Sequence, residues 1–320
     1  MKCFYHIDED GKCSAFWVNK LARHYDGYEK KFIPINYGVE FPFETIQPDE
    51  QVYIVDYSIF PEEMEKLLKI TSEITWIDHH ASAIKRYDNF PHNIKGIRYD
   101  GIAGCMLTYC YLTHMYSNGF LTGARFEEWM TEDAPMFTKY IADFDVWKFE
   151  YGDDTRAFEM GLQLYDSDPI AEGKDNIFEA MLIWGCEVER NVVSRGRDLL
   201  IYRDNWAKEY CGHVGFETEF EGYKCFAMNL AMISSDHFKS VNEEEYDMFI
   251  GFSYNGKTWN YSLRSTKVDC SQIAMKYGGG GHKGAAGFNT DRLLLKAKEE
   301  WCLSTKDMLK LYNELIKKES

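Results

Sequence analysis

The segment TWIDHH, residues 75–80, is a run of β-branched and aromatic residues that ends in one acidic side chain and two histidines. Similar short apolar runs occur at CFYHI (3–7), KKFIPINYG (30–38) and QVYIVDYS (51–58). Amphipathic stretches of helical period separate them, for example at 62–73. Apolar runs of about four to six residues that alternate with helices are typical of a parallel sheet covered on both faces. The first part of the chain is therefore predicted to be an α/β domain.

The pattern changes in the second half of the chain. Residues 171–210 contain few glycines or prolines and predict long helices. After them, 213–231 and 246–265 read as paired strands, with a two-residue hairpin turn at Asn255-Gly256. We therefore expect a parallel-sheet domain at 1–190, a helical linker at 191–210 and a smaller mixed α/β domain at 211–320.

The composition restricts the kinds of partner. The 320 residues include 52 Asp or Glu and 36 Lys or Arg, which gives a formal net charge of −16. A broad nucleic-acid-binding surface needs a surplus of Lys and Arg to displace counterions, so long nucleic acids are not expected as partners. A short phosphate ester held in a small site is compatible with this charge.

Two further features concern the cellular compartment. No window approaches the roughly 18 consecutive apolar residues of a membrane span, and the apolar run near the N-terminus is too short for a secretory signal. The nine cysteines are scattered singly without a CxxC pair, which favours reduced thiols over a disulfide framework or a zinc ribbon. We expect a cytoplasmic protein with no membrane association. The sequence is compatible with a homodimer.

Acidic and histidine side chains gather at the carboxyl ends of the predicted strands. In an open α/β sheet these ends line one crevice, which is where ligands bind. The segment KYIAD (139–143), inside a stretch that itself reads as a helix, is counted with the strand ends because it also finishes on acidic residues. The four segments contribute His6, Asp8 and Asp10; Asp56; Asp78, His79 and His80; and Asp143 with Asp145.

A cluster with at least four carboxylates, one or more from each segment, needs positive charge among its members. Two carboxylates about 4 Å apart repel each other by roughly 4 kcal/mol at an effective dielectric constant of about 20. Two divalent cations balance four carboxylates, and neutral imidazoles complete the coordination shells. Mixed oxygen and imidazole ligands suit Mn²⁺ particularly well, whereas thiolate-rich sites suit Zn²⁺. We therefore predict a centre of two Mn²⁺ ions, with Mg²⁺ or Co²⁺ as substitutes.

These motifs resemble the DHH phosphoesterase superfamily, specifically its DHH–DHHA1 branch. Four motifs in the first domain carry the resemblance: HIDEDG (6–11), IVD (54–56), IDHH (77–80) and IAD (141–143). In the second domain, YSLRS (261–265) and DCSQIAMKYGGGGHKGAAGF (269–288) are similar to the DHHA1 signature. The match spans nearly the whole chain. Small-oligoribonucleotide and cyclic-nucleotide phosphodiesterases of bacteria and phages are the members that the chain resembles most.

The resemblance implies a role for each matched residue of the first domain. His80 would face the scissile phosphate or lie just behind the metal ions, and Asp78 would orient its neighbours through hydrogen bonds. Asp56 would bridge two metal ions and so take part in catalysis. For the fourth motif, Asp143 is preferred as the ligand and Asp145 is the alternative. The implied ligands besides Asp56 are His6 and Asp8 for one ion, and Asp10, His79 and Asp143 for the other.

The glycine-rich loop of the second domain implies a substrate pocket. Consecutive glycines allow backbone N–H groups to approach an anion closely, and Arg and His side chains donate hydrogen bonds to phosphate. The residues expected to hold the terminal phosphate or nucleotide of the substrate are Arg264, Ser265, Gly278, Gly279, Gly280, Gly281 and His282.

The two motif sets together predict a metal-dependent phosphodiesterase. Two metal ions lower the pKa of a shared water, and the bridging hydroxide would attack phosphorus without a covalent nucleophile. The expected substrates are short oligoribonucleotides, cleaved to nucleoside monophosphates, with the second domain measuring length from one end. Alternatives with the same chemistry are 3′-phosphoadenosine 5′-phosphate, cyclic nucleotides and cyclic dinucleotides. An inorganic pyrophosphatase or polyphosphatase and a non-catalytic nucleotide sensor are the remaining alternatives.

Overall fold

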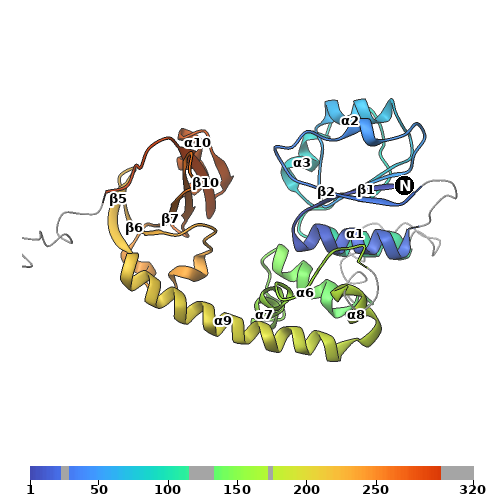
Figure 1. Cartoon of the computed structure of the whole chain (residues 1–320). Coiled ribbons are helices and arrows are strands. Elements are labelled where there is room, and N and C mark those ends of the chain that lie inside the picture. The colour runs from blue at the N-terminus through green and yellow to red at the C-terminus, as the bar shows by residue number, and fades with distance from the viewer. Residues whose placement is uncertain (23–28, 115–132, 172–175, 297–320) are drawn as a thin grey trace, which may run out of the picture. The chain divides into compact units, whose positions relative to one another are not determined.

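The computed structural model describes residues 1–22, 29–114, 133–171 and 176–296. The chain divides into two compact units, Met1–Leu200 and Ile201–Ser320. The division falls within helix α9 (Cys186–Val214; Figure 1), inside the segment for which a helical linker is expected. Within the described ranges, no helix combines the length and the apolar character needed to cross a bilayer.

The first unit is built on a four-stranded sheet. Its strands lie in the order β2-β1-β3-β4, and each neighbouring pair is parallel. The strands fall on the four apolar runs of the sequence, which confirms the predicted parallel-sheet α/β fold. Their bounds are Lys2–His6 (β1), Lys31–Ile35 (β2), Val52–Val55 (β3) and Ile74–Ile77 (β4).

Helices cover both faces of this sheet (Figure 1). The described helices of the unit are α1 (Glu9–Leu21), α2 (Pro61–Leu68), α3 (Ala81–Arg86), α4 (Gly104–His114), α6 (Met136–Asp145), α7 (Asp153–Leu162) and α8 (Ile177–Trp184), with a 3₁₀ turn at Phe43–Thr45. Successive side chains of a strand point to opposite faces. Cys3 and Tyr5 therefore pack into a core with α1, α4, α6 and α7, whereas Phe4 packs into a second core with α2.

The parallel strands end together at one edge of the sheet. Tyr5 lies opposite Val55, and Val55 lies opposite Ile77. The residues that follow β1, β3 and β4 therefore leave the sheet side by side. Because both faces of the sheet are buried, this register is strongly specified, and it brings the acidic and histidine residues of three motifs to the same edge.

The second unit contains a mixed six-stranded sheet in the order β5-β6-β7-β8-β10-β9. β6 and β7 pair in parallel, and the other neighbours are antiparallel. Helix α10 (Cys270–Lys276) packs on this sheet through Ile273. The remaining bounds are Phe216–Phe220 (β5), Tyr223–Asn229 (β6), Met248–Tyr254 (β7), Trp259–Arg264 (β8), Gly280–His282 (β9) and Ala285–Thr290 (β10), with 3₁₀ turns at Ser235–Phe238 and Glu243–Glu245.

The turn predicted at Asn255-Gly256 joins β7 to β8, but its loop holds four residues instead of two. Tyr254 and Trp259 are the last paired residues of the hairpin. Oδ1 of Asn255 accepts hydrogen bonds from the N–H groups of Lys257 and Thr258, both at 2.9 Å. The side chain of Asn255 thus closes a longer turn than the Asn-Gly pair alone predicts.

Candidate metal centre

The turn between β1 and α1 positions three of the candidate ligands. His6 ends β1, Asp8 is the N-cap of α1 and Asp10 lies in the first turn of that helix. Oδ1 of Asp8 accepts a hydrogen bond from the N–H of Gly11 (2.9 Å), as an N-cap carboxylate commonly does. Oδ2 of Asp8 lies 2.5 Å from Nδ1 of His6. The helix cap therefore holds Asp8 against the end of the strand.

Asp56 follows β3 directly and has a backbone φ of +52°, a left-handed conformation that persists only where the surroundings hold it. Its N–H donates to the carbonyl of Ile77 (2.9 Å), which anchors it to the end of β4. The side chain is 1% exposed. Among the described residues, neither carboxylate oxygen of Asp56 has a hydrogen-bond partner. A buried carboxylate without donors is costly, so this site favours a cation beside it.

In the DHH triplet after β4, Asp78 holds the imidazole ring of His80 in place. Asp78 is fully buried and accepts hydrogen bonds from the backbone N–H of His79 (2.8 Å) and from the hydroxyl of Ser58. Its Oδ1 also lies 2.7 Å from Nδ1 of His80. This contact fixes the imidazole ring of His80 and leaves Nε2 as the ring nitrogen that can meet a ligand.

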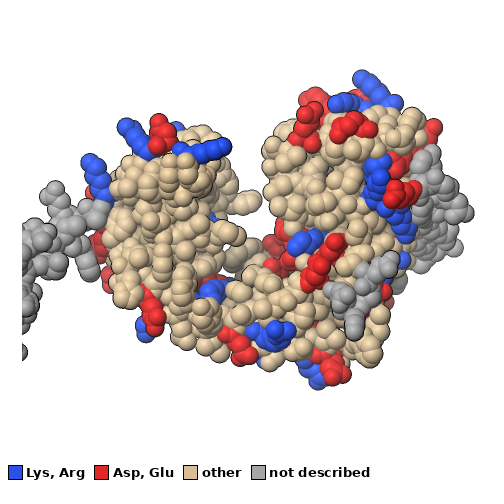
Figure 2. Space-filling model, in the orientation of Figure 1, with Lys and Arg blue, Asp and Glu red and all other residues tan. Residues whose placement is uncertain are grey.

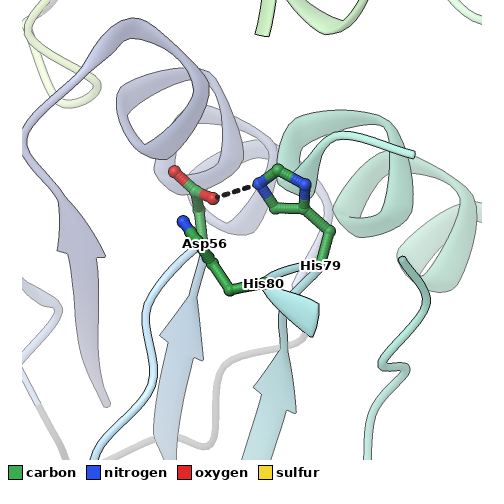
Figure 3. A group of neighbouring side chains, drawn as sticks. All are labelled: Asp56, His79 and His80. Carbon is green, nitrogen blue, oxygen red and sulfur yellow. Dashed lines mark ion pairs between the residues drawn. The ribbon is translucent and has the colours of Figure 1, made fainter. Parts of the chain in front are cut away.

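Side chains from three other segments gather around Asp56. Nε2 of His79 lies 3.1 Å from Oδ1 of Asp56, 3.7 Å from Oδ2 of Asp10 and 3.3 Å from Oδ2 of Asp145. Figure 3 shows the ring of His79 facing the carboxylate of Asp56, with His80 next to it in the chain. Three sets of ligand atoms each lie within 4.8 Å of one another: His6, Asp8 and Asp56; Asp10, His79 and Asp145; and Asp56, His79 and His80.

Asp145, and not Asp143, joins this group. Both residues belong to the helix α6 and not to a strand end, and residues two apart on a helix point to different sides of it. The carboxylate of Asp143 turns to the following loop, where it accepts hydrogen bonds from the N–H groups of Glu150 (2.8 Å) and Tyr151 (3.3 Å) and from the hydroxyl of Thr155. The preference for Asp143 does not fit this geometry, whereas the alternative, Asp145, does.

Crowding raises the pKa of the carboxyl groups at the middle of the cluster. Burial, followed by the negative charges of Asp10 and Asp8, raises the pKa of Asp56 well above its usual range. The same causes in the same order raise the pKa of Asp145 to about 8. Both carboxyl groups therefore hold protons more tightly than usual unless a cation lies among them.

The Asp78–His80 pair is shifted by its own interaction. Burial alone would raise the pKa of Asp78 and lower the pKa of His80. The hydrogen bond and the charge attraction between the two side chains outweigh burial, so the pKa of Asp78 is lowered and the pKa of His80 is raised. The imidazole of His80 therefore keeps its second proton to a higher pH than a free histidine.

The donor set fits divalent cations. The oxygens of Asp56 and Oδ2 of Asp145 are buried without a hydrogen-bond partner among the described residues, and the imidazoles of His6 and His79 face them. Carboxylate and imidazole ligands suit Mn²⁺ and similar ions, and no thiolate joins the three sets found in the described part of the chain. Asp56 belongs to two of those sets, which is the arrangement of a ligand shared between two ions.

Gly104 is a site residue that the sequence patterns did not single out. It begins α4, and its N–H and that of Cys105 each donate to the carboxylate of Asp10 at 2.7 Å. A Cβ atom at position 104 would lie 2.7 Å from Cβ of Asp56 and 3.0 Å from Oδ2 of Asp10. Glycine is therefore the residue that fits between α4 and the centre. The signal in the sequence is a glycine in the first turn of a helix, where it is less favourable than most other residues.

In the second unit, two of the expected substrate-binding side chains bond to the backbone. The guanidinium of Arg264 donates to the carbonyls of Leu263 and Ile233, both at 2.8 Å. The hydroxyl of Ser265 donates to the carbonyl of Asp247 (2.6 Å). Both side chains thus help to hold the end of β8 in place, whatever they contribute to a ligand.

The four consecutive glycines of the second unit do not behave alike. The N–H groups of Gly278 and Gly279 donate to the carbonyls of Met275 (3.1 Å) and Ala274 (2.9 Å), and so close the last turn of α10. The N–H groups of these two residues are therefore not available to an anion in the way expected for all four glycines. The other residues of the expected pocket, Gly280, Gly281 and His282, form the exposed edge strand β9.

No family model and no curated protein matches this sequence. Solved structures do resemble the chain. The DHH domain of a member of the s1p family of ribosomal proteins matches at 14% identity with a TM-score of 0.51, over 98% of this chain and 86% of that chain.

Two further solved structures align over most of their length. A pGpG-specific phosphodiesterase, PggH from Vibrio cholerae, shares 10% identity at a TM-score of 0.46, over 99% of this chain and 98% of that chain. The exonuclease RecJ bound to manganese shares 14% identity at a TM-score of 0.45, over 91% of this chain and 85% of that chain. The likeness to the DHH domain of the s1p-family member, at a TM-score of 0.51, concerns the fold, and on it we identify this chain as a protein of the DHH-domain fold.

Proposed function

We propose that this protein is a divalent-metal-dependent phosphodiesterase that hydrolyses short oligoribonucleotides to nucleoside monophosphates. The observation that carries the proposal is the convergence of carboxylates and imidazoles on the buried Asp56, whose own oxygens have no hydrogen-bond partner among the described residues. The first three motifs that resemble the DHH phosphoesterases supply most of these side chains, and Asp145 lies two residues after the fourth.

In this proposal the cluster holds two Mn²⁺ ions. Ions of this kind supply a water of lowered pKa and offset the negative charge of the phosphoryl oxygens. Asp56 holds a position between the two ligand sets because its backbone is anchored to Ile77. The proposed ligands besides Asp56 are His6 and Asp8 on one side, and Asp10, His79 and Asp145 on the other.

His80 is proposed to handle a proton at the scissile phosphate. Its Nδ1 is held by the buried carboxylate of Asp78, so Nε2 is the atom that would meet the phosphate. Because the pKa of His80 is raised, the ring can carry a proton near neutral pH and donate it to the leaving oxygen. Asp78 acts through His80 and keeps its ring in one orientation.

Charge supports short substrates over long ones. The chain carries a net charge of −16. On the face drawn in Figure 2, Lys and Arg side chains lie among Asp and Glu side chains and form no continuous basic stripe across the part of the chain shown in colour. A long polyanion needs such a stripe, whereas the end of a short one can be held by a few groups. Gly280, Gly281 and His282, exposed on β9, are the proposed contacts for that end.

The test is hydrolysis of a labelled RNA series, from dinucleotide to about twenty nucleotides, in the presence of Mn²⁺. Rapid turnover of the shortest members that Asp56→Ala abolishes would support the proposal. Turnover of 3′-phosphoadenosine 5′-phosphate or of a cyclic dinucleotide, but not of RNA, would support the same metal-dependent hydrolysis with a different substrate. Binding of these compounds without turnover of any of them would favour a nucleotide sensor.

A second variant tests whether the first unit carries out catalysis and the second unit binds the substrate. Asp56→Ala should remove turnover, because it removes the shared ligand. His282→Ala should mainly raise KM, because His282 is proposed to contact the substrate and not the reacting phosphate. Equal effects of the two changes on KM alone would contradict these roles.

A further inference from the structure

A cavity of about 330 Å³ lies in the first unit. One wall is the loop Tyr99–Ala103, and the other is the end of α6 with the loop that follows it to Tyr151. The first wall adjoins the centre at both of its ends. Ala103 precedes Gly104, whose N–H donates to Asp10, and the N–H of Tyr99 donates to the carbonyl of Asp78 (3.1 Å).

The lining of this cavity combines an apolar floor with a polar, aromatic rim. Ile102, Ala103, Met106, Ala142 and Val146 form the apolar part. Tyr99 and Tyr151 are partly exposed, at 38% and 36%. The charged residues of the lining are Lys139 and Lys148, together with Asp100, Asp143 and Glu150. Ligand pockets are commonly mainly apolar with a few polar groups that fix orientation, and their volumes begin near 300 Å³.

The loop that forms one wall is held in an unusual shape. Trp147 and Phe149 have φ values of +55° and +53°, which are rare for bulky side chains. The carboxylate of Asp143 maintains this shape, because it accepts hydrogen bonds from the N–H groups of Glu150 and Tyr151 within the loop. Backbone strain of this kind concentrates at ligand sites, where a wall has to be formed before the ligand arrives. Asp143 is thus a positioning residue for the wall of the cavity.

We infer that this cavity binds the nucleoside of the nucleotide whose phosphate is cleaved, and that it sets the preference for nucleotides over other phosphate esters. A planar base suits the apolar floor and the tyrosine rings, and the amine of Lys148 suits the phosphate or the ribose at the rim. The site deepens the proposed function and rests on it, since it concerns the same substrate. It is separate from the glycine-rich loop of the second unit.

The test compares two esters that share a phosphodiester but differ in the base. One is the dinucleotide pApA, and the other is bis(p-nitrophenyl) phosphate, which has no base or ribose. Tyr151→Ala and Lys148→Ala should each lower the ratio of the two kcat/KM values, pApA over the base-free ester, by about 10-fold. The loss should lie in the KM for pApA, and Tyr151→Phe should restore most of it. Tyr202→Ala, an exposed tyrosine on α9, is the matched control.

An unchanged ratio in Lys148→Ala and in correctly folded Tyr151→Ala would overturn the inference. Binding of adenosine 5′-monophosphate to the metal-free protein, measured by calorimetry, separates this result from failure of the proposed function. The wild-type protein could hydrolyse neither ester and still bind the monophosphate with an affinity that Tyr151→Ala lowers. That result would support the nucleoside site and contradict the phosphodiesterase activity. If the wild-type protein hydrolyses both esters, and neither Tyr151→Ala nor Lys148→Ala changes its affinity for the monophosphate, the phosphodiesterase activity is supported and the nucleoside site is contradicted.

Discussion

Oδ2 of Asp145 lies 3.3 Å from Nε2 of His79, in the middle of the acidic cluster. Asp143, two residues earlier on α6, accepts hydrogen bonds from Glu150, Tyr151 and Thr155 and takes no part in the sets of candidate ligands. A carboxylate with three donors has little reason to bind a cation, whereas Oδ2 of Asp145 has no donor among the described residues.

This difference predicts opposite outcomes for two matched substitutions. Asp145→Asn should reduce bound Mn²⁺ from two ions per chain to one and lower kcat by about 100-fold, because a ligand is lost. Asp143→Asn should keep both ions, since its effect is on the following loop. Metal content after dialysis, measured by atomic absorption, checks both. Loss of an ion from Asp143→Asn alone would restore Asp143 as the ligand.

Metal affinity should depend on pH. Folding raises the pKa of Asp56 and raises that of Asp145 to about 8, whereas an unfolded Asp titrates near about 3.9. Between these values the folded metal-free protein binds more protons than the unfolded chain, so its stability should fall as the pH rises toward about 8. Mn²⁺ must displace the same protons, so its affinity should rise about tenfold per pH unit for each proton released.

Calorimetric titration of Mn²⁺ at pH 6 and pH 8, in buffers of different ionisation enthalpy, measures both the affinity and the protons released. Asp145→Asn is the control, because it should release fewer protons than the wild-type protein. An affinity that stays constant between these two pH values would argue against mutual crowding of the carboxylates.

Asp78→Asn should change the pH profile of catalysis. Without the negative charge of Asp78, the pKa of His80 loses the interaction that raises it, so the alkaline limb of the kcat profile should move to lower pH. We also expect kcat to fall by about 10- to 100-fold, the usual effect of removing a group that orients an active-site residue. A fall in kcat with an unmoved alkaline limb would show that His80 does not carry the proton.

The parallel sheet and the edge that bears the centre could be predicted from the sequence, because strand ends and the period of buried runs are local properties. The choice between Asp143 and Asp145 could not, since it depends on which side of α6 faces His79. The behaviour of Gly278 and Gly279 depends on the carbonyls that end α10. Gly104 was missed for a similar reason: its closeness to Asp10 and Asp56 joins segments about fifty to ninety residues apart in the chain.

Gly104→Ala should therefore weaken metal binding although none of the candidate ligands is substituted. The new Cβ would lie 2.7 Å from Cβ of Asp56 and 3.0 Å from Oδ2 of Asp10, so α4 or the two carboxylates must move. We expect a loss of about 1–3 kcal/mol in the free energy of unfolding, as for other overpacked sites, together with at least about tenfold weaker Mn²⁺ binding. Gly212→Ala is the matched control, because a Cβ at that position in α9 meets nothing within 4 Å. It should leave metal binding unchanged. Normal Mn²⁺ affinity in a folded Gly104→Ala variant would mean that α4 can retreat without disturbing Asp56, and that the close approach of this helix is not needed to build the centre.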